Sequence, residues 1–179
     1  SHIYLRKDKN WAEKYTFPSS EKLIDDLLQL DAVDIVMTKN EKNQIVIKST
    51  RGIAILENKD SGLQYTPLLN DPFGYKGISD FLTFEDSLDK TFDTQYPDAL
   101  VQIFQIFNSP RCGDIVVSAE TGFDLRNKFE FPEHKSSHGS LKSDHMHVPL
   151  IVNKQILNNR IRTVDLFPTI VDFLGFNCP

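Results

Sequence analysis

The sequence predicts an α/β protein in which a mostly parallel sheet with helices follows a small α+β region. Residues 115–119 and 148–152 are almost wholly apolar, a pattern typical of strands buried on both faces of a parallel sheet. Amphipathic helical stripes over 97–107 and 163–174 accompany them, and mixed strands and helices indicate an α/β sheet. Earlier in the chain, residues 33–69 alternate with a period of two, as an antiparallel meander does.

The first elements belong to the smaller region. Residues 3–5 form an apolar, strand-like burst at the start of the chain. A helix is expected after Pro18, because apolar residues over 23–30 recur at helical spacing and lie opposite Asp25 and Asp26.

The meander follows this helix. Its strands are separated by short polar or glycine-containing turns, and they are expected at 33–37, 45–47, 53–56 and 63–65. Residues 70–80 hold a proline and two glycines, which favour a loop. We therefore expect a small antiparallel α+β region, similar to a cap, over 1–80 and the α/β region over 81–179.

The second region is expected to alternate helices and strands. Pro97 at a first helical position starts a helix that stops before Pro110. The strand over 115–119 follows, and Pro149 restricts the strand over 148–152 to a strand start or a sheet edge. A last helix is expected from Thr163 as N-cap to Gly175 as stop.

Composition excludes several classes of protein. The chain has 179 residues, of which 40% are hydrophobic, so a globular core is expected and disorder is not. A net charge of −5 without a basic face argues against binding to a nucleic-acid backbone. No apolar run approaches the roughly 18 residues of a membrane span, so we expect a soluble chain. Cys112 and Cys178 are too few for a disulfide framework or a cysteine-based zinc site.

A polar segment between the two apolar strands concentrates candidate ligands. Residues 129–147 hold four of the five histidines, namely His134, His138, His145 and His147. Neutral imidazole is the commonest metal ligand among side chains, and Gly139 lets the backbone beside His138 approach a metal closely. Taken alone, His138 is more typical of an ordinary solvated loop histidine, because most histidines in polar loops bind nothing.

Four segments together resemble a known family. The order of residues 113–117, His138-Gly139-Ser140-Leu141, residues 147–151 and residues 163–175 resembles the C-terminal end of the alkaline phosphatase superfamily. More narrowly, it is similar to the branch of type I phosphodiesterases, nucleotide pyrophosphatases and related phosphohydrolases. The resemblance covers roughly Pro110 to Gly175.

The resemblance implies a dinuclear metal chemistry. Enzymes of this family hold two divalent metal ions, commonly zinc, and a Thr or Ser nucleophile attacks phosphorus. The late His-Gly histidine of the family is a metal ligand, and His138 matches that position. The nucleophile and the other ligands are not found in this sequence, so no catalytic residue is assigned and the substrate-binding residues are unknown.

The resemblance further implies that this chain is a fragment of a phosphohydrolase. Its expected partners are a small phosphoester and an N-terminal remainder of the same protein, which would carry the missing ligands. We expect the isolated chain to be inactive and to hold no metal stably. Ser143-Asp144-His145-Met146 is rejected as the Ser-Asp-His-Gly motif of the family, because it lacks the glycine and a preceding apolar strand.

Two alternatives stay open. The chain could be a non-enzymatic binding module on a degenerate scaffold, with the meander as its binding surface. It could also be a mononuclear metallohydrolase that uses His134, His138 and either His145 or His147, since three protein ligands suffice for catalytic zinc. Strand alternation would otherwise send one of His145 and His147 into the interior and the other towards a cleft.

Asp124 and Arg126 form a further candidate pair near this segment. They could face a phosphate together, or they could form an ordinary surface ion pair.

Overall fold

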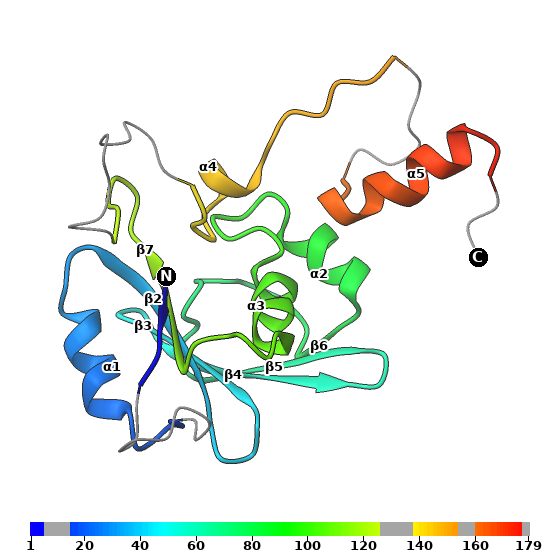
Figure 1. Ribbon diagram of the computed structural model, residues 1–179. Coiled ribbons are helices and arrows are strands. Elements are labelled where there is room, and N and C mark those ends of the chain that lie inside the picture. Colours follow the sequence, from blue (N-terminus) through cyan, green and yellow to red (C-terminus); the bar gives the residue numbers. More distant parts are fainter. Residues whose placement is uncertain (6–14, 126–137, 154–159, 177–179) are drawn as a thin grey trace. The chain divides into compact units, whose positions relative to one another are not determined.

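The computed structural model describes residues 1–5, 15–125, 138–153 and 160–176. The chain divides into two compact units, Ser1–Val148 and Pro149–Pro179. The first unit contains a seven-stranded sheet in the order β1-β7-β2-β3-β4-β5-β6, in which every pairing between neighbouring strands is antiparallel. Strands from both sides of residue 80 therefore share one sheet (Figure 1).

The elements of the first unit have the following bounds. The strands are β1 (His2–Ile3), β2 (Val33–Lys39), β3 (Ile45–Ser49), β4 (Ile53–Lys59), β5 (Gly62–Leu69), β6 (Phe81–Leu82) and β7 (Ile115–Ala119). The helices are α1 (Glu21–Leu28), α2 (Phe84–Thr91), α3 (Ala99–Asn108) and the short α4 (Ser143–Met146). The predicted helix after Pro18 and the antiparallel meander are confirmed by α1 and by β2 to β5.

The prediction of a mostly parallel sheet is wrong. Strand β7, expected to be parallel, pairs antiparallel with β1 on one side and with β2 on the other. Figure 1 shows β1 beside β7, although the two strands lie more than a hundred residues apart in the chain. An apolar run indicates that a strand is buried on both faces. It does not indicate whether the neighbouring strands run parallel or antiparallel to it.

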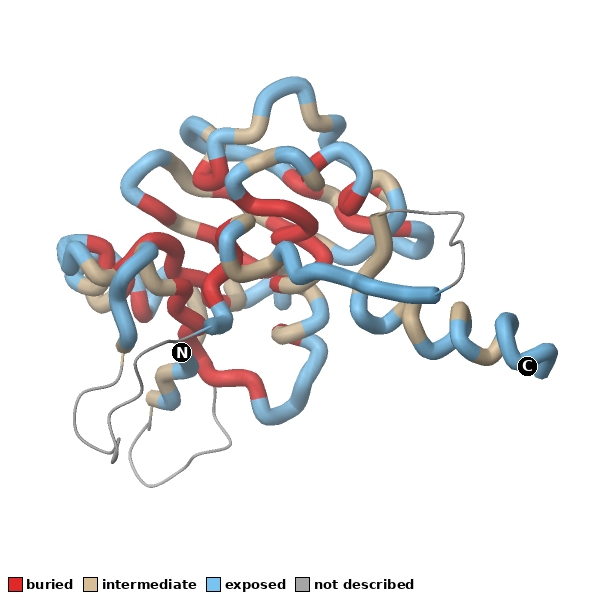
Figure 2. Tube along the Cα trace, turned by 90° about the horizontal axis from the view of Figure 1, so that it is seen from above, coloured by how far each residue is buried: buried red, intermediate tan, exposed pale blue. Residues whose placement is uncertain are grey.

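Burial of β7 on both faces is confirmed, because the sheet separates two hydrophobic clusters. The larger core combines α3 with one sheet face, and it includes Ile35, Ile47, Leu56, Leu100, Ile103 and Val116. The smaller core combines α1 with the other face, and it includes Ile24, Leu28, Val36, Ile115 and Val117. Successive β7 residues alternate between these two cores, as the period of a strand requires. Figure 2 shows in red the segments of the chain that are buried.

Two local expectations near α3 differ from the structure. The sequence reading missed α2, whose N-cap Thr83 accepts a hydrogen bond from the Asp86 amide at 3.0 Å. Helix α3 begins at Ala99, and its N-cap Asp98 has a left-handed φ of 55°. Pro97 therefore precedes the cap and does not occupy the first helical position.

The second unit contains a 3₁₀ turn η1 (Thr163–Asp165) and helix α5 (Leu166–Phe173). The expected last helix is confirmed by α5, and Gly175 follows it with a φ of 74°, which suits a helix stop. The prediction of Thr163 as its N-cap is wrong, because Thr163 lies inside η1, which Arg162 caps, and Asp165 is the N-cap of α5. The expected strand over 148–152 is wrong, because these residues form no strand and are exposed. Apolar side chains of α5 such as Phe167 and Ile170 are exposed as well.

Within the described ranges, no helix combines the length and the apolar character that crossing a bilayer requires.

Candidate functional site

The candidate site centres on His138 and Gly139, which precede a buried segment of the first unit. His138 is exposed, whereas Ser140, Leu141 and Lys142 are buried. Gly139 has a φ of 102°, and a Cβ built there would meet no atom within 4 Å. Glycine is therefore needed for the backbone conformation and not for space, since side chains disfavour this region. We call residues 140–142 the anchor of His138.

The anchor is fastened to the end of β7. The Leu141 amide donates a hydrogen bond to the Ser118 hydroxyl of β7 at 3.4 Å, and the Leu141 side chain packs in the larger core. The Lys142 amide donates to the Ser140 hydroxyl at 3.1 Å, which closes a tight turn. The backbone that follows Gly139 is thus held against the sheet.

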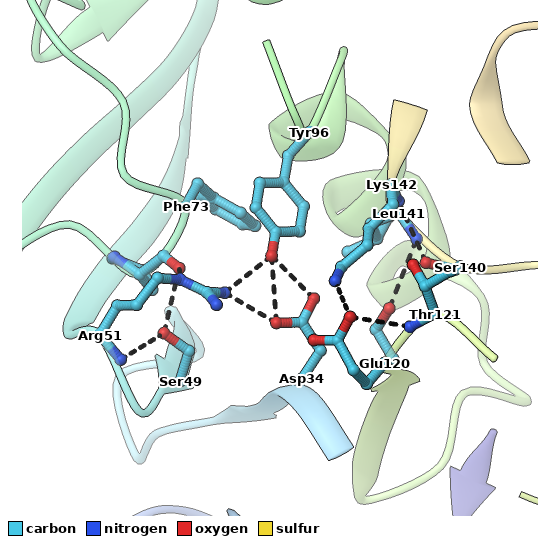
Figure 3. A network of polar contacts seen from close by, with 12 residues as sticks. Asp34, Ser49, Arg51, Phe73, Tyr96, Glu120, Thr121, Ser140, Leu141 and Lys142 are labelled. Carbon is cyan, nitrogen blue, oxygen red and sulfur yellow. Dashed lines mark hydrogen bonds and ion pairs between the residues drawn. The ribbon is translucent and has the colours of Figure 1, made fainter. Parts of the chain in front are cut away.

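An ion pair adds a second attachment. The Lys142 ammonium donates to Oε1 of Glu120, which directly follows β7 (Figure 3). The Lys142 side chain is only 7% exposed and that of Glu120 is 36% exposed. The hydrogen bond from Lys142 is the main cause that lowers the pKa of Glu120, and the Thr121 amide donates to the same oxygen at 2.8 Å. Glu120 is therefore held as a carboxylate.

Near this ion pair, the buried Asp34 and Tyr96 form a hydrogen-bonded cluster with Arg51, whose side chain is 37% exposed (Figure 3). The Tyr96 hydroxyl donates to the Asp34 carboxylate at 2.9 and 3.0 Å, and Arg51 Nη2 donates to Asp34 at 2.8 Å. Burial, followed by the charge of Asp34, raises the pKa of Tyr96 above its ordinary value. The phenol consequently stays protonated and acts as the donor.

A β-bulge explains why a carboxylate is buried in β2. Val33 is opposite Ala119 and Ile35 is opposite Ser118, so Asp34 is the extra residue at a register shift. Val33 packs in the smaller core and Ile35 in the larger core, although a regular strand would place both on one face. The bulge thereby turns Asp34 towards Tyr96.

Helix α4 holds the other end of the anchor. The Ser143 amide donates to the carbonyl of Gln95 at 2.9 Å, and the Ser140 amide donates to Nδ1 of His145 at 3.3 Å. The His147 ring stacks on Phe92 with a centroid separation of 4.6 Å. The expectation that His145 and His147 alternate along a strand is wrong, because His145 lies in α4 and His147 is its C-cap.

Several predicted site residues are not brought together by the described structure. His134, Arg126 and Cys178 lie outside the described residues, so neither the three-histidine zinc site nor the Asp124–Arg126 pair is tested. Within the ranges that the structure describes, no group of three or more His, Cys, Asp or Glu could hold a metal ion. Of the three histidines of residues 129–147 that the structure describes, His145 accepts the Ser140 amide and His147 stacks on Phe92, whereas His138 is exposed.

A separate cavity of about 480 Å³ lies between the β2–β3 turn and the segment that joins α3 to β7. Its lining includes Lys39, Asn40, Phe107, Cys112 and Asp114. His138 is not among its lining residues. The sequence reading missed this cavity, because its walls come from segments far apart in the chain.

Comparison of the chain with protein-family models, with curated proteins and with solved structures found no match.

Proposed function

We propose that this chain is part of a metal-dependent phosphohydrolase that hydrolyses phosphate esters with two divalent metal ions, and that His138 ligates one of them. The observation that carries the proposal is the anchored histidine: His138 is exposed, and the three residues after Gly139 are buried. A metal-ligating side chain whose neighbouring backbone is already fixed loses less conformational freedom when it binds the metal.

The chemistry of the anchor supports this role for His138. Imidazole is a ligand for zinc and similar ions, and zinc is therefore the candidate metal. Such an ion, when bound, stabilises negative charge on a phosphoryl group and lowers the pKa of a bound water. The contribution of this chain is to hold the imidazole, with Gly139 supplying the positive-φ backbone conformation that joins His138 to the anchor.

The remaining ligands and the nucleophile are proposed to come from further segments of the same protein. The support is the exposed apolar surface of the second unit, where Ile151 is 91% and Phe167 is 69% exposed. Large apolar side chains exposed on one unit favour a further layer of protein that covers them. A small phosphoester is the proposed substrate.

The test is to replace His138 in the protein as its gene encodes it and to measure both bound zinc and hydrolysis of an aryl phosphodiester. We expect His138→Ala to lower turnover at low zinc by roughly 100-fold or more, because the effect of losing a metal ligand exceeds that of losing its supporting residues. His2→Asn is the matched control, because asparagine retains an acceptor for the Gly113 amide that His2 accepts at 3.1 Å.

Two results would contradict the proposal. The first is a His138→Ala protein with unchanged zinc content and turnover. The second is robust hydrolysis by the isolated chain of 179 residues that depends on His138, since a fragment with one ligand cannot supply the whole reaction.

A second candidate function is ligand binding without catalysis, which the cavity beside the β2–β3 turn favours. Its volume of about 480 Å³ falls within the range of small-molecule sites. Screening of small ligands by amide NMR would test it. Shifts confined to the cavity lining, unaffected by His138→Ala, would favour the binding module, and the absence of any such ligand would count against it.

A further inference from the structure

The buried ammonium of Lys142 lies only four residues after His138. Its side chain is 7% exposed, whereas most lysines keep their charge in water. Burying a charge is unfavourable unless a partner of opposite charge compensates it, and here Glu120 is that partner. An apolar residue at this position would fill the same space without the unfavourable desolvation. The ion pair therefore points to a requirement other than stability.

We propose that Lys142 is a positioning residue for His138. Its ammonium, bound by Glu120, fixes the anchor at the end of β7 and so sets the direction in which Gly139 and His138 leave the sheet. This inference rests on the proposed function, because it assigns the support of the ligand that His138 provides.

Glu120 is suited to hold Lys142 because it is itself fixed. The Glu120 amide donates to the carbonyl of Ala32 at 3.0 Å, just before β2. Its Oε1 also accepts from the Thr121 amide at 2.8 Å, which leaves the carboxylate little freedom to rotate. Through Glu120, Lys142 is thereby held in a fixed position relative to strands β7 and β2.

The Asp34, Arg51 and Tyr96 cluster supports the same arrangement. The positive charge of Arg51 lowers the pKa of Glu120 further, after the contributions of Lys142 and Thr121. Gln95, the neighbour of Tyr96, accepts the Ser143 amide and so holds the residue that follows the anchor. The anchor is consequently held on both sides, and Gly139 is the first residue outside it.

The experiment compares Lys142→Met, Lys142→Arg and Glu120→Gln in the protein as its gene encodes it. Methionine keeps most of the apolar stem and removes the charge, whereas arginine retains the charge. We expect Lys142→Met and Glu120→Gln to weaken zinc binding by about 10- to 100-fold, the usual effect of losing a residue that supports a metal ligand. Turnover should recover at high zinc, the KM for the phosphoester should not change, and Lys142→Arg should retain affinity.

A second measurement uses the chain of 179 residues and does not depend on activity. Amide hydrogen exchange at Leu141 and Lys142 should become about 10-fold faster in Lys142→Met, while exchange in β3 and β4 stays unchanged, because only the anchor is released. This local readout distinguishes lost positioning from general unfolding. Unchanged exchange at the anchor would overturn the inference.

The two proposals fail differently. If His138→Ala abolishes zinc binding but Lys142→Met and Glu120→Gln do not weaken it, the inference is overturned and the proposed function stands. If His138→Ala leaves zinc binding intact, both are overturned. A loss of activity in Lys142→Met that high zinc does not restore would also contradict positioning through the metal ligand.

Discussion

The buried side chains of Asp34 and Tyr96 meet the partly exposed guanidinium of Arg51. Asp34 accepts from both Tyr96 and Arg51, and the Arg51 Nε also donates to the carbonyl of Pro72 at 2.8 Å. A carboxylate with these partners is compensated for its lost hydration. Removal of one partner should therefore destabilise the first unit more than an exposed hydrogen bond of the same kind would.

Tyr96→Phe tests this interpretation at the level of one atom. The variant removes only the hydroxyl that donates to Asp34, so we expect the free energy of unfolding to fall by about 1–3 kcal/mol. Tyr4→Phe is the control, because the Tyr4 hydroxyl donates to the Arg111 carbonyl in an exposed position. Urea unfolding monitored by circular dichroism gives both values. Equal effects of the two variants would contradict the assigned role of Tyr96.

Glu120 predicts a pH dependence of stability. Because Lys142 lowers the pKa of Glu120 in the folded chain, the pair stabilises the fold above the ordinary glutamate pKa of 4.5, and this contribution is lost as the pH falls through the lowered value. Wild type and Glu120→Gln should therefore differ in unfolding free energy near pH 7 and converge at low pH. A difference that grows as the solution is acidified would contradict this account.

The residue contacts could not be predicted from the sequence, because they join distant positions. Asp34 and Tyr96 are 62 residues apart, and Glu120 and Lys142 are 22 residues apart. One signal was present: Asp34 interrupts an otherwise apolar strand, and a carboxylate there needs a partner. The identity of that partner requires the three-dimensional structure.

At the scale of elements, helices and strands with a long, regular period were predicted correctly. Helix α1 and strands β2 to β5 follow from their apolar spacing. Helix α2 was missed because its eight residues are mostly polar. Its start signal was Thr83 three residues before Asp86, which is the spacing of an N-terminal cap.

The cap of α2 leads to a prediction at this scale. Thr83→Ala should lower the free energy of unfolding by about 1 kcal/mol, because the Asp86 amide loses the acceptor that caps the N-terminus of α2. Thr83→Ser is the matched control and should retain most of the stability, since serine supplies the same oxygen. Guanidinium unfolding of the two variants provides the measurement. A serine variant as unstable as the alanine variant would show that the methyl group of Thr83, and not its hydroxyl, matters.

At the scale of the whole molecule, strand direction was the main error. Two apolar runs predict parallel strands, yet β7 is antiparallel and residues 148–152 form no strand. Burial determines how apolar a strand is. Whether strands pair parallel or antiparallel depends on how the chain connects them, and the residue types within a strand do not show this. The proposed covering layer would give residues 148–152 the burial that their composition favours.

The division into two units predicts that the first can fold alone. A chain that ends at Val148 should keep its sheet and unfold cooperatively, because the two hydrophobic cores lie within Ser1–Val148. The full chain should self-associate more, since α5 exposes Phe167, Ile170 and Phe173. Sedimentation velocity and thermal unfolding of the two chains measure these properties. Loss of cooperative unfolding in the shorter chain would contradict the division.

The central claim is that the imidazole of His138 binds a metal ion beside a fixed anchor. Anomalous diffraction at the zinc edge, from crystals of the protein as its gene encodes it grown with zinc, tests this most directly. The account predicts an anomalous peak about 2.0–2.1 Å from a ring nitrogen of His138, with the Lys142–Glu120 pair intact. A zinc peak bound by other residues, with the His138 ring in contact only with solvent, would contradict it.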